Sequence, residues 1–337
     1  MSRTTPIELQ TLTGTIGAQV TGVDLSQDLD SETFSAITKA LHDHLVLVFP
    51  GQDLTPAQQS EFSKRFGPAE PHPYGAREGV NNENPEVIVL ETKPGRRGAR
   101  NDFWHSDISA SERPPALSFL HARIITPGRG DTMFCNMARA YDTLTDKMKA
   151  VVGDLQSVYD FTLVSGVKDR TAENEAELYK INPPVAHPTV RVHNESGVKA
   201  LYVSERTSHF NGMSRAESAP IIQYLCEQAT QPENVYRHQW RVGDVVFWDN
   251  GEAMQPNDAL GSTGGSMGLG SVSCSGEVGC TGAARTKVNL GIFQGALVTL
   301  GPRGLRDPRG PQGRQGCLWG PGPPSTRPLR PWARVPW

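Results

Sequence analysis

Four short apolar segments constrain the fold of this chain more than any other feature of its sequence. They read LVLVF (45–49), EVIVL (86–90), LSFLHARII (117–125) and DVVFW (244–248). Segments of this length that are rich in Val, Ile, Leu and Phe are typical of β-strands with buried side chains. The sequence therefore predicts a mainly β domain over residues 1–258.

Four helices are predicted among or ahead of these strands. The first begins near Ser31 and carries an apolar face, and the second follows the capping-box sequence TPAQ (55–58) and ends at Gly67. Two more are predicted over residues 140–155 and 215–229, the latter despite an internal proline. The predicted class is α+β with a dominant β component.

The C-terminal part of the chain has a different composition. Residues 259–285 are rich in Gly and Ser, which predicts a flexible linker or insertion, and residues 286–300 contain a further strand candidate. Residues 301–337 contain nine Pro, seven Gly and seven Arg. Because disorder is expected once Pro and Gly exceed roughly 25–30% of a segment, we predict a disordered basic tail. A polyanion-binding arm stays open as an alternative.

Charge and hydropathy exclude several classes of partner. The formal net charge of −3 gives no basic field for nucleic acid, and no long apolar run or signal peptide suggests a membrane. The expected location is the cytoplasm. The five cysteines show no paired spacing, so we predict free thiols.

The segment NDFWHSDIS (101–109) places His105 and Asp107 two residues apart. In an extended strand, residues i and i+2 point to the same face, so the imidazole and the carboxylate could hold one metal ion. The alternative is a simple hydrogen bond between the two side chains or to solvent. The spacing alone leaves both open.

Five segments together carry a family resemblance. They are GAQVTGVDLSQDL (17–29), LVLVFPGQDLTPAQQSEFSKRFG (45–67), FWHSD (103–107), GRGDTMFCNMARAYDTL (128–144) and WRVGDVVFWDN (240–250). In this order they resemble the taurine dioxygenase (TauD/TfdA) family of Fe(II)- and 2-oxoglutarate-dependent oxygenases. The resemblance implies a double-stranded β-helix, or jelly roll, with helices packed outside.

The resemblance also implies a function and its site. The expected reaction is hydroxylation of a small organic acid or sulfonate, with O2 and 2-oxoglutarate as co-substrates and Fe(II) as the metal. His105 and Asp107 match two ligands of a facial triad of two His and one carboxylate, and Thr132 matches a residue that helps hold the far carboxylate of 2-oxoglutarate. Three residues match substrate contacts: His72, Tyr74 and Asn101.

Other positions matched by the resemblance have less specific roles. Trp104 would seal the far face of the strand that carries the metal pair. Ser165 and Thr207 stand where the taurine enzyme has aromatic pocket residues, so taurine itself is not the expected substrate. The other histidines are interpreted as core or surface residues, and the oligomeric state, including a homo-oligomer, stays open.

The C-terminal half of the family signature is missing at its expected spacing. Gln255 occupies the place of the second histidine, no histidine follows His238, and Ser266 occupies the place of the arginine that pairs with 2-oxoglutarate. The first later arginine is Arg285. The sequence therefore predicts a jelly roll that is incomplete at its C-terminal end. The alternative function is a catalytically impaired relative or an aberrant gene product, from a frameshift or retained intron.

Overall fold

The computed structural model describes residues 7–69, 83–92, 103–125, 130–161, 176, 179–180, 182–193, 196–256 and 286–293. The chain divides into two compact units, residues 1–299 and 300–337, and the described residues all belong to the first. The predicted linker (259–285) and tail (301–337) lie outside the described residues.

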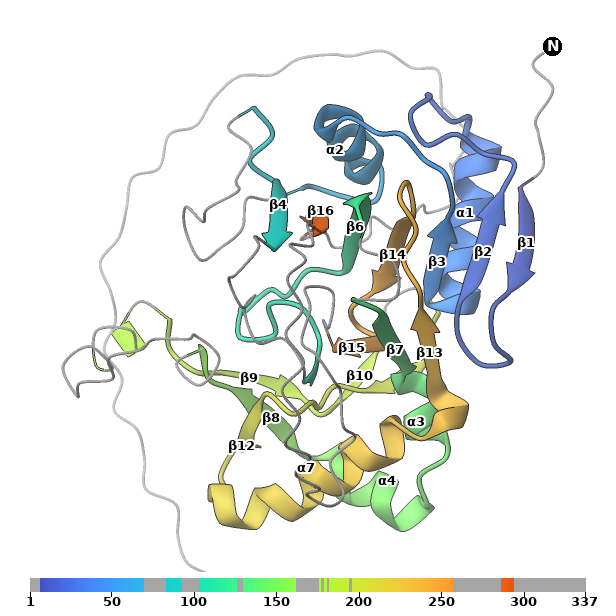
Figure 1. The fold of residues 1–337 in the computed structure, drawn as a ribbon. Coiled ribbons are helices and arrows are strands. Elements are labelled where there is room, and N and C mark those ends of the chain that lie inside the picture. The colour runs from blue at the N-terminus through green and yellow to red at the C-terminus, as the bar shows by residue number, and fades with distance from the viewer. Residues whose placement is uncertain are drawn as a thin grey trace, which may run out of the picture. The chain divides into compact units, whose positions relative to one another are not determined.

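The described unit is mainly β with a few helices (Figure 1). Its strands are β1 (Glu8–Thr11), β2 (Ala18–Thr21), β3 (Val46–Phe49), β4 (Val87–Thr92), β5 (Trp104–His105), β6 (Leu117–Ile124), β7 (Thr132–Asn136), β8 (Gln156–Tyr159), β9 (Val185–Pro188), β10 (Val190–Val192), β11 (Lys199–Leu201), β12 (Thr207–Phe210), β13 (Val235–His238), β14 (Val245–Asp249), β15 (Ala253–Pro256) and β16 (Thr286–Phe293). Its helices are α1 (Ser31–His44), α2 (Pro56–Lys64), α3 (Met137–Asp142), α4 (Asp146–Gly153) and α7 (Arg215–Ala229), with a 3-10 turn, η1, at Pro232–Asn234.

The largest sheet has seven strands in the order β1-β2-β3-β14-β6-β16-β4. All of its pairs are antiparallel except β2 with β3, and Val246 of β14 lies between Val48 of β3 and Leu120 of β6. Every residue of β14 is buried. Because side chains alternate along a strand, β14 contributes to a core on each side of this sheet.

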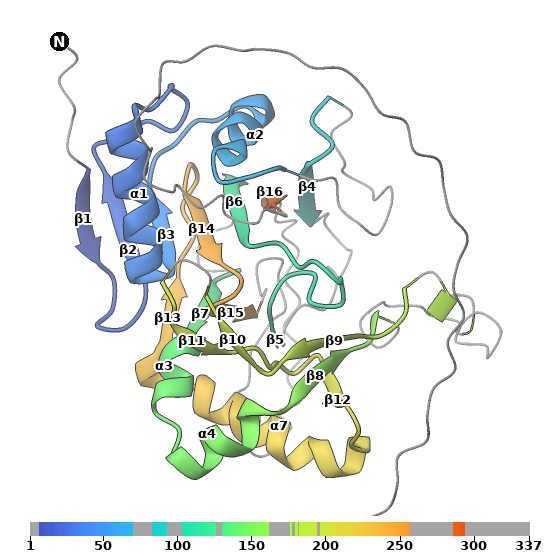
Figure 2. The same cartoon turned by 180° about the vertical axis from the view of Figure 1, so that it is seen from behind.

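The core outside the large sheet lies beneath α1 and α2. Ile37 and Leu41 of α1 and Phe62 of α2 pack there against Phe49 and Phe247. The predicted apolar face of the first helix is thereby confirmed. In Figure 2 this helix lies along the face of β2 and β3.

The core on the other side lies between the large sheet and a four-stranded sheet. This second sheet has the order β13-β7-β15-β5. The rings of Phe134 in β7 and Trp248 in β14 are 5.3 Å apart, centroid to centroid. Val246 and Leu120 join the same buried cluster, so the two sheets share one apolar interior.

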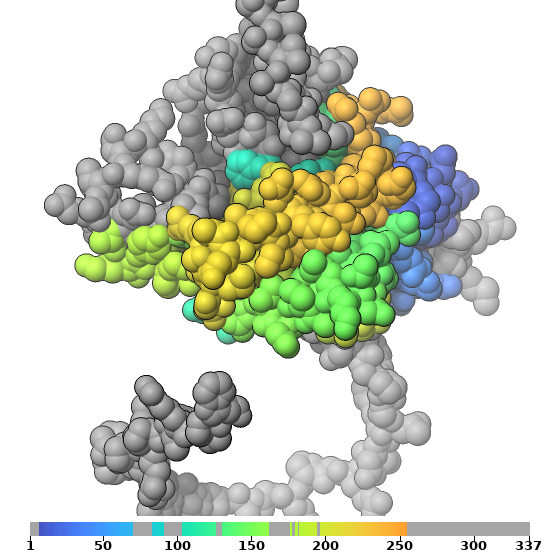
Figure 3. Space-filling model, turned by 90° about the horizontal axis from the view of Figure 1, so that it is seen from below, coloured from blue at the N-terminus to red at the C-terminus, as the bar shows by residue number. Residues whose placement is uncertain are grey.

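Two smaller sheets, β12-β8-β9 and β10-β11, complete the strand pairing. Seen from below, the segment containing α7 (yellow) lies beside the segment containing α4 (green) and covers this face (Figure 3). Buried side chains of α7, including Leu225, pack against β11 and β12. The predicted helix 215–229 is confirmed at both ends, with a capping box between Ser214 and Glu217.

Two of the predicted helices differ from the structure in where they end or begin. The capping box of Thr55 and Gln58 is present, but α2 ends at Lys64, ahead of Gly67. The single helix predicted over 140–155 is wrong: α3 ends at Asp142 and α4 begins at Asp146, because the Thr145 side chain accepts a hydrogen bond from Met148 N and starts a new helix.

β16 comes from the part of the chain whose composition suggested an incomplete barrel. It pairs with β6 on one side and β4 on the other (Figure 1). The expectation of a large sheet left incomplete at this end is therefore corrected, since a strand from residues 286–293 fills that place and hydrogen-bonds to both neighbours. Within the described residues, no helix is both long and apolar enough to cross a membrane.

The aromatic core beneath the helices should dominate stability. The Phe247 ring stacks on Phe49 and Phe119 at centroid distances of 5.0 and 4.7 Å. We expect Phe247→Ala to lower the free energy of unfolding by about 3–5 kcal/mol, as is typical for aromatic truncation in a core. Urea denaturation measures this change. The control Val242→Ala, at a 63% exposed position, should change it by less than about 0.5 kcal/mol, and a similar loss in both variants would contradict the expectation.

Candidate metal and co-substrate site

The predicted metal pair converges in the structure. His105 Nε2 lies 3.6 Å from Asp107 Oδ1, and the two side chains are 3% and 11% exposed. His105 ends the short strand β5, whereas Asp107 lies in the following turn, next to Ile108 with φ of 46°. The side chains therefore meet as predicted, but a turn brings them together and not strand alternation.

The imidazole of His105 is oriented by the backbone. Its Nδ1 lies 2.8 Å from the carbonyl oxygen of Phe103. Because a carbonyl can only accept, Nδ1 carries a proton, which leaves Nε2, on the Asp107 side, as the nitrogen that could bind a metal ion. Histidines that bind a metal through one ring nitrogen usually donate a hydrogen bond from the other nitrogen in this way.

The carboxylate of Asp107 accepts a hydrogen bond from a hydroxyl, which in turn accepts one from an amide. Ser118 Oγ donates to Asp107 Oδ2 at 2.6 Å, and Asn250 Nδ2 donates to Ser118 Oγ at 2.8 Å. Burial alone would raise the pKa of Asp107, but His105, Ser118 and the charge of Arg206 together hold this pKa below its ordinary value. Asp107 therefore stays an anionic oxygen donor at neutral pH.

Asn250 connects this pair to the strand crossover, a role that sequence reasoning did not assign. It follows β14, and its backbone carbonyl accepts from Ser106 Oγ at 2.8 Å. Its Oδ1 accepts from Trp248 Nε1 at 3.1 Å and from Asp107 N at 3.4 Å. The WDN sequence was the available signal, because an Asn directly after a buried strand can bond to neighbouring backbone.

Residue 255 occupies the register position opposite His105. β15 pairs with β5 so that Gln255 faces His105 and Pro256 faces Trp104. Directly opposed residues of an antiparallel pair share one face of the sheet. Among the described residues no group of three His, Cys, Asp or Glu side chains could hold a metal ion.

Thr132 lies in the same sheet, at the start of β7 and opposite His238 of β13. Its side chain is fully buried, and its Oγ1 accepts from Trp240 Nε1 at 3.0 Å. A hydroxyl that accepts from an indole can still donate its own hydrogen to an oxygen. This geometry suits the predicted contact with a carboxylate.

A narrow pocket, too tight in this structure to admit a water molecule, lies beside the metal pair. It is lined by Ser106, Met137, Tyr159, Leu201, Tyr202, Val203, Ser204, Asn250, Gly251, Ala253 and Met254. Two guanidinium groups lie around it: Arg191 is 4.6 Å from the centroid of the Tyr202 ring, and Arg206 is 4.4 Å from that of Phe103. Positive charge therefore accompanies the pocket.

Several predicted site residues cannot be compared with the structure. His72, Tyr74 and Asn101 lie outside the described residues, as do Ser165, Ser266 and Arg285. Thr207 is described: it is buried at the start of β12, and its hydroxyl accepts from Ser204 N at 3.0 Å. This contact makes Thr207 a turn-stabilising residue next to the pocket wall.

The support of Asp107 predicts the effect of removing one hydroxyl. Ser118→Ala should lower the free energy of unfolding at pH 7 by about 1–3 kcal/mol, because it deprives a buried carboxylate and the Asn250 amide of a partner. Thermal and urea denaturation test this. Ser35→Ala, an exposed position on α1, should stay within about 0.5 kcal/mol of the parent. An equally small change for Ser118→Ala would show that this network does not stabilise the site.

Comparison with known proteins shows the family. The model of the taurine catabolism dioxygenase TauD, TfdA family matches residues 8–254. An alkylsulfatase from Acinetobacter baylyi is 34% identical over 258 residues, which are 73% of this chain and 78% of the relative. The α-ketoglutarate-dependent 2,4-dichlorophenoxyacetate dioxygenase of Cupriavidus pinatubonensis is 35% identical over 249 residues, 69% of this chain and 85% of that protein.

Solved structures agree with the sequence relatives. A taurine dioxygenase from Burkholderia xenovorans has a TM-score of 0.66 at 28% identity and covers 86% of this chain and 89% of its own. The structure of AAD-2 in complex with Mn(II) and N-oxalylglycine has a TM-score of 0.65 at 28% identity, with 86% of this chain and 98% of that chain covered. On the family match, the relatives and the shared fold, this chain belongs to the TauD/TfdA dioxygenase family.

Proposed function

We propose that this chain is an Fe(II)- and 2-oxoglutarate-dependent dioxygenase that hydroxylates a small organic anion. The observation that carries the proposal is the convergence of His105 Nε2 and Asp107 Oδ1 at 3.6 Å, in a buried site next to a pocket. One neutral nitrogen and one anionic oxygen suit Fe(II), and they fit two of the three positions of a facial triad. Bound iron would supply the O2 chemistry.

The chain's own residues have separable tasks in this proposal. His105 and Asp107 would hold the metal, while Phe103 O and Ser118 fix the orientation of these two ligands. The Thr132 hydroxyl would donate to the far carboxylate of 2-oxoglutarate, since Trp240 already donates to its oxygen. The two sheets that carry these residues would form the double-stranded β-helix of the family.

The substrate class follows from charge near the pocket. The charge of Arg206 acts on Asp107, and Arg191 packs on the ring of Tyr202, which lines the pocket. Guanidinium groups recognise carboxylate and sulfate-type oxygens well. Relatives named for sulfate esters and phenoxyacetates are consistent with this chemistry. We therefore propose organic acids, sulfonates or sulfate esters as substrates, with His72, Tyr74 and Asn101 as further contacts.

Anaerobic titration tests the function directly. Protein with Fe(II) and 2-oxoglutarate should develop a metal-to-ligand charge-transfer absorption band, and after addition of O2 it should form succinate. Organic anions should stimulate succinate formation more than their neutral analogues. His105→Ala is the matched negative control. If the parent chain gives neither the band nor succinate, the catalytic proposal fails for this chain.

The register of β15 predicts a gain of metal affinity. Because position 255 lies opposite His105, Gln255→His should tighten Mn(II) binding, measured by electron paramagnetic resonance. The expected gain is at least about tenfold, since losing even a group that supports a metal ligand typically costs 10–100-fold. Gln255→Leu controls for the loss of the amide. Equal affinities in Gln255→His and the parent would mean that residue 255 does not reach the metal.

Gln255 also supports a second candidate, a relative that keeps the scaffold and binds ligands without turnover. The family match ends at residue 254, one position before this glutamine. In that case Gln255→His should produce the charge-transfer band that the parent lacks. Succinate formation by the unmodified chain would eliminate this candidate.

A further inference from the structure

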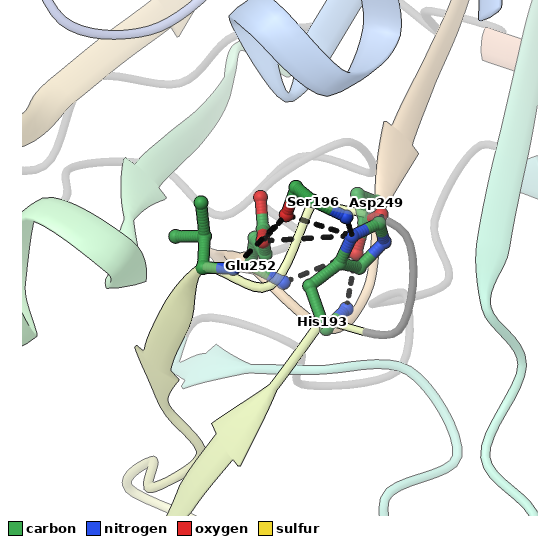
Figure 4. Close-up of polar contacts among 6 residues, drawn as sticks. His193, Ser196, Asp249 and Glu252 are labelled. Atoms are coloured by element: carbon green, nitrogen blue, oxygen red, sulfur yellow. Dashed lines mark hydrogen bonds and ion pairs between the residues drawn. The ribbon is translucent and has the colours of Figure 1, made fainter.

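A second buried polar cluster lies outside the metal pair (Figure 4). His193 follows β10 and Ser196 lies in the same hairpin, while Asp249 ends β14 and Glu252 precedes β15. The side chains of His193, Asp249 and Glu252 are 11%, 5% and 3% exposed. An imidazole and two carboxylates are thus buried together, although the family function uses none of them.

The imidazole of His193 lies between the two carboxylates. Its Nε2 is 3.2 Å from Asp249 Oδ2, and its Nδ1 is 3.9 Å from Glu252 Oε1. Ser196 Oγ donates to Glu252 Oε1 at 3.3 Å, and Ser196 N donates to His193 Nδ1 at 3.2 Å. The hairpin therefore contacts both ends of the segment 249–252.

Two other roles for these residues do not agree with the geometry. A metal ion could not use both carboxylates with His193, because they approach opposite nitrogens of the ring. Ser196 lies near His193 Nδ1, but its own backbone N–H already donates to that nitrogen, so the ring is not available there as a base for its hydroxyl. A structural connection between two segments remains.

The connected segments form two walls of the pocket. The strand β11, which closes the hairpin, leads into Leu201–Ser204, and the segment 249–252 crosses from the seven-stranded to the four-stranded sheet. Residues 201–204 line the pocket on one side, and residues 250, 251, 253 and 254 line it from the crossover. The distance between these two pocket walls therefore depends on how the hairpin is attached to the crossover.

The protonation of Glu252 affects this fastening. Burial and then the charge of Asp249 raise the pKa of Glu252 to about 7, although His193 and Ser196 oppose the shift. The titratable groups around it are Asp249, His193 and, from α1, His42, whose ring centroid is 5.3 Å from that of His193. Since the folded-state pKa is raised, Glu252 contributes stability that is present at low pH and lost as pH rises through about 7.

We propose that His193, Asp249 and Glu252 form a clamp that fastens the β10–β11 hairpin to the sheet crossover and sets the distance between the two pocket walls. His193 is a positioning residue in this clamp, since it acts on the pocket through the segments that it joins. The clamp belongs to the fold itself, so its test needs neither metal nor substrate and can fail independently of the proposed dioxygenase activity.

Hydrogen–deuterium exchange of the full-length, metal-free protein tests the clamp. In His193→Gln, peptides covering residues 198–204 and 249–254 should exchange at least about tenfold faster than in the parent, because local opening is no longer opposed. Peptides from α1 and β3 should exchange within about twofold of the parent rate. Unchanged rates in both pocket segments would overturn the proposal, and so would an equal increase along the whole chain.

The dependence of hydrogen-exchange protection on pH provides a second readout, which a general loss of packing would not change. In the parent, protection of both segments, corrected for intrinsic exchange, should fall as pH rises from 4.5, the ordinary pKa of a glutamate, to about 7, and should level off at higher pH, because Glu252 loses its proton. Glu252→Gln keeps the size and a hydrogen-bond acceptor but cannot ionise, so it should retain protection and flatten the profile. Glu233→Gln, an exposed glutamate on η1, should reproduce the parent profile. A parent profile that is flat, or unchanged by Glu252→Gln, would overturn the clamp.

Discussion

The double burial of β14 is the constraint on which the other features of this structure depend. The strand lies between β3 and β6 in the seven-stranded sheet, and all five of its residues are buried. Phe247 faces the helices, while Trp248 faces the interior between the sheets. A strand held on both faces and both edges cannot shift in register without exposing an entire apolar set. The residues that follow β14 therefore start from a fixed point in the fold.

That fixed point organises the site. Asn250, the first residue after the strand, accepts hydrogen bonds from Ser106 Oγ and from Asp107 N. It also donates to the Ser118 hydroxyl, which in turn donates to the Asp107 carboxylate. The same crossover then carries β15 to the position opposite His105. The metal pair is thus oriented by the end of a core strand, which is the kind of rigid support that an ordered metal site needs. Substitutions in the crossover should disturb ligand geometry before they disturb the core.

One departure from the family pattern, Gln255, lies in the described part of the chain. His105, Asp107 and Thr132 are buried and hydrogen-bonded, and residue 255 pairs with His105 in the register of β15 and β5. β16 nevertheless joins the large sheet after the Gly- and Ser-rich segment. The register opposite His105 is why a single substitution at 255 is an informative experiment.

The sequence by itself determined the main strands and the capped helices, because these depend on local periodicity and short signals. It also indicated that His105 and Asp107 lie close together, although the turn that brings them together was not predicted. It could not determine that α3 and α4 are separate, since the Thr145 cap competes with a continuous apolar pattern. It also gave no sign of the Asn250 network or of the cluster around His193, in which contacts join segments more than fifty residues apart in sequence. Only the tertiary structure decided these contacts, because the burial of β14 within the seven-stranded sheet brings distant polar groups together where water cannot reach them.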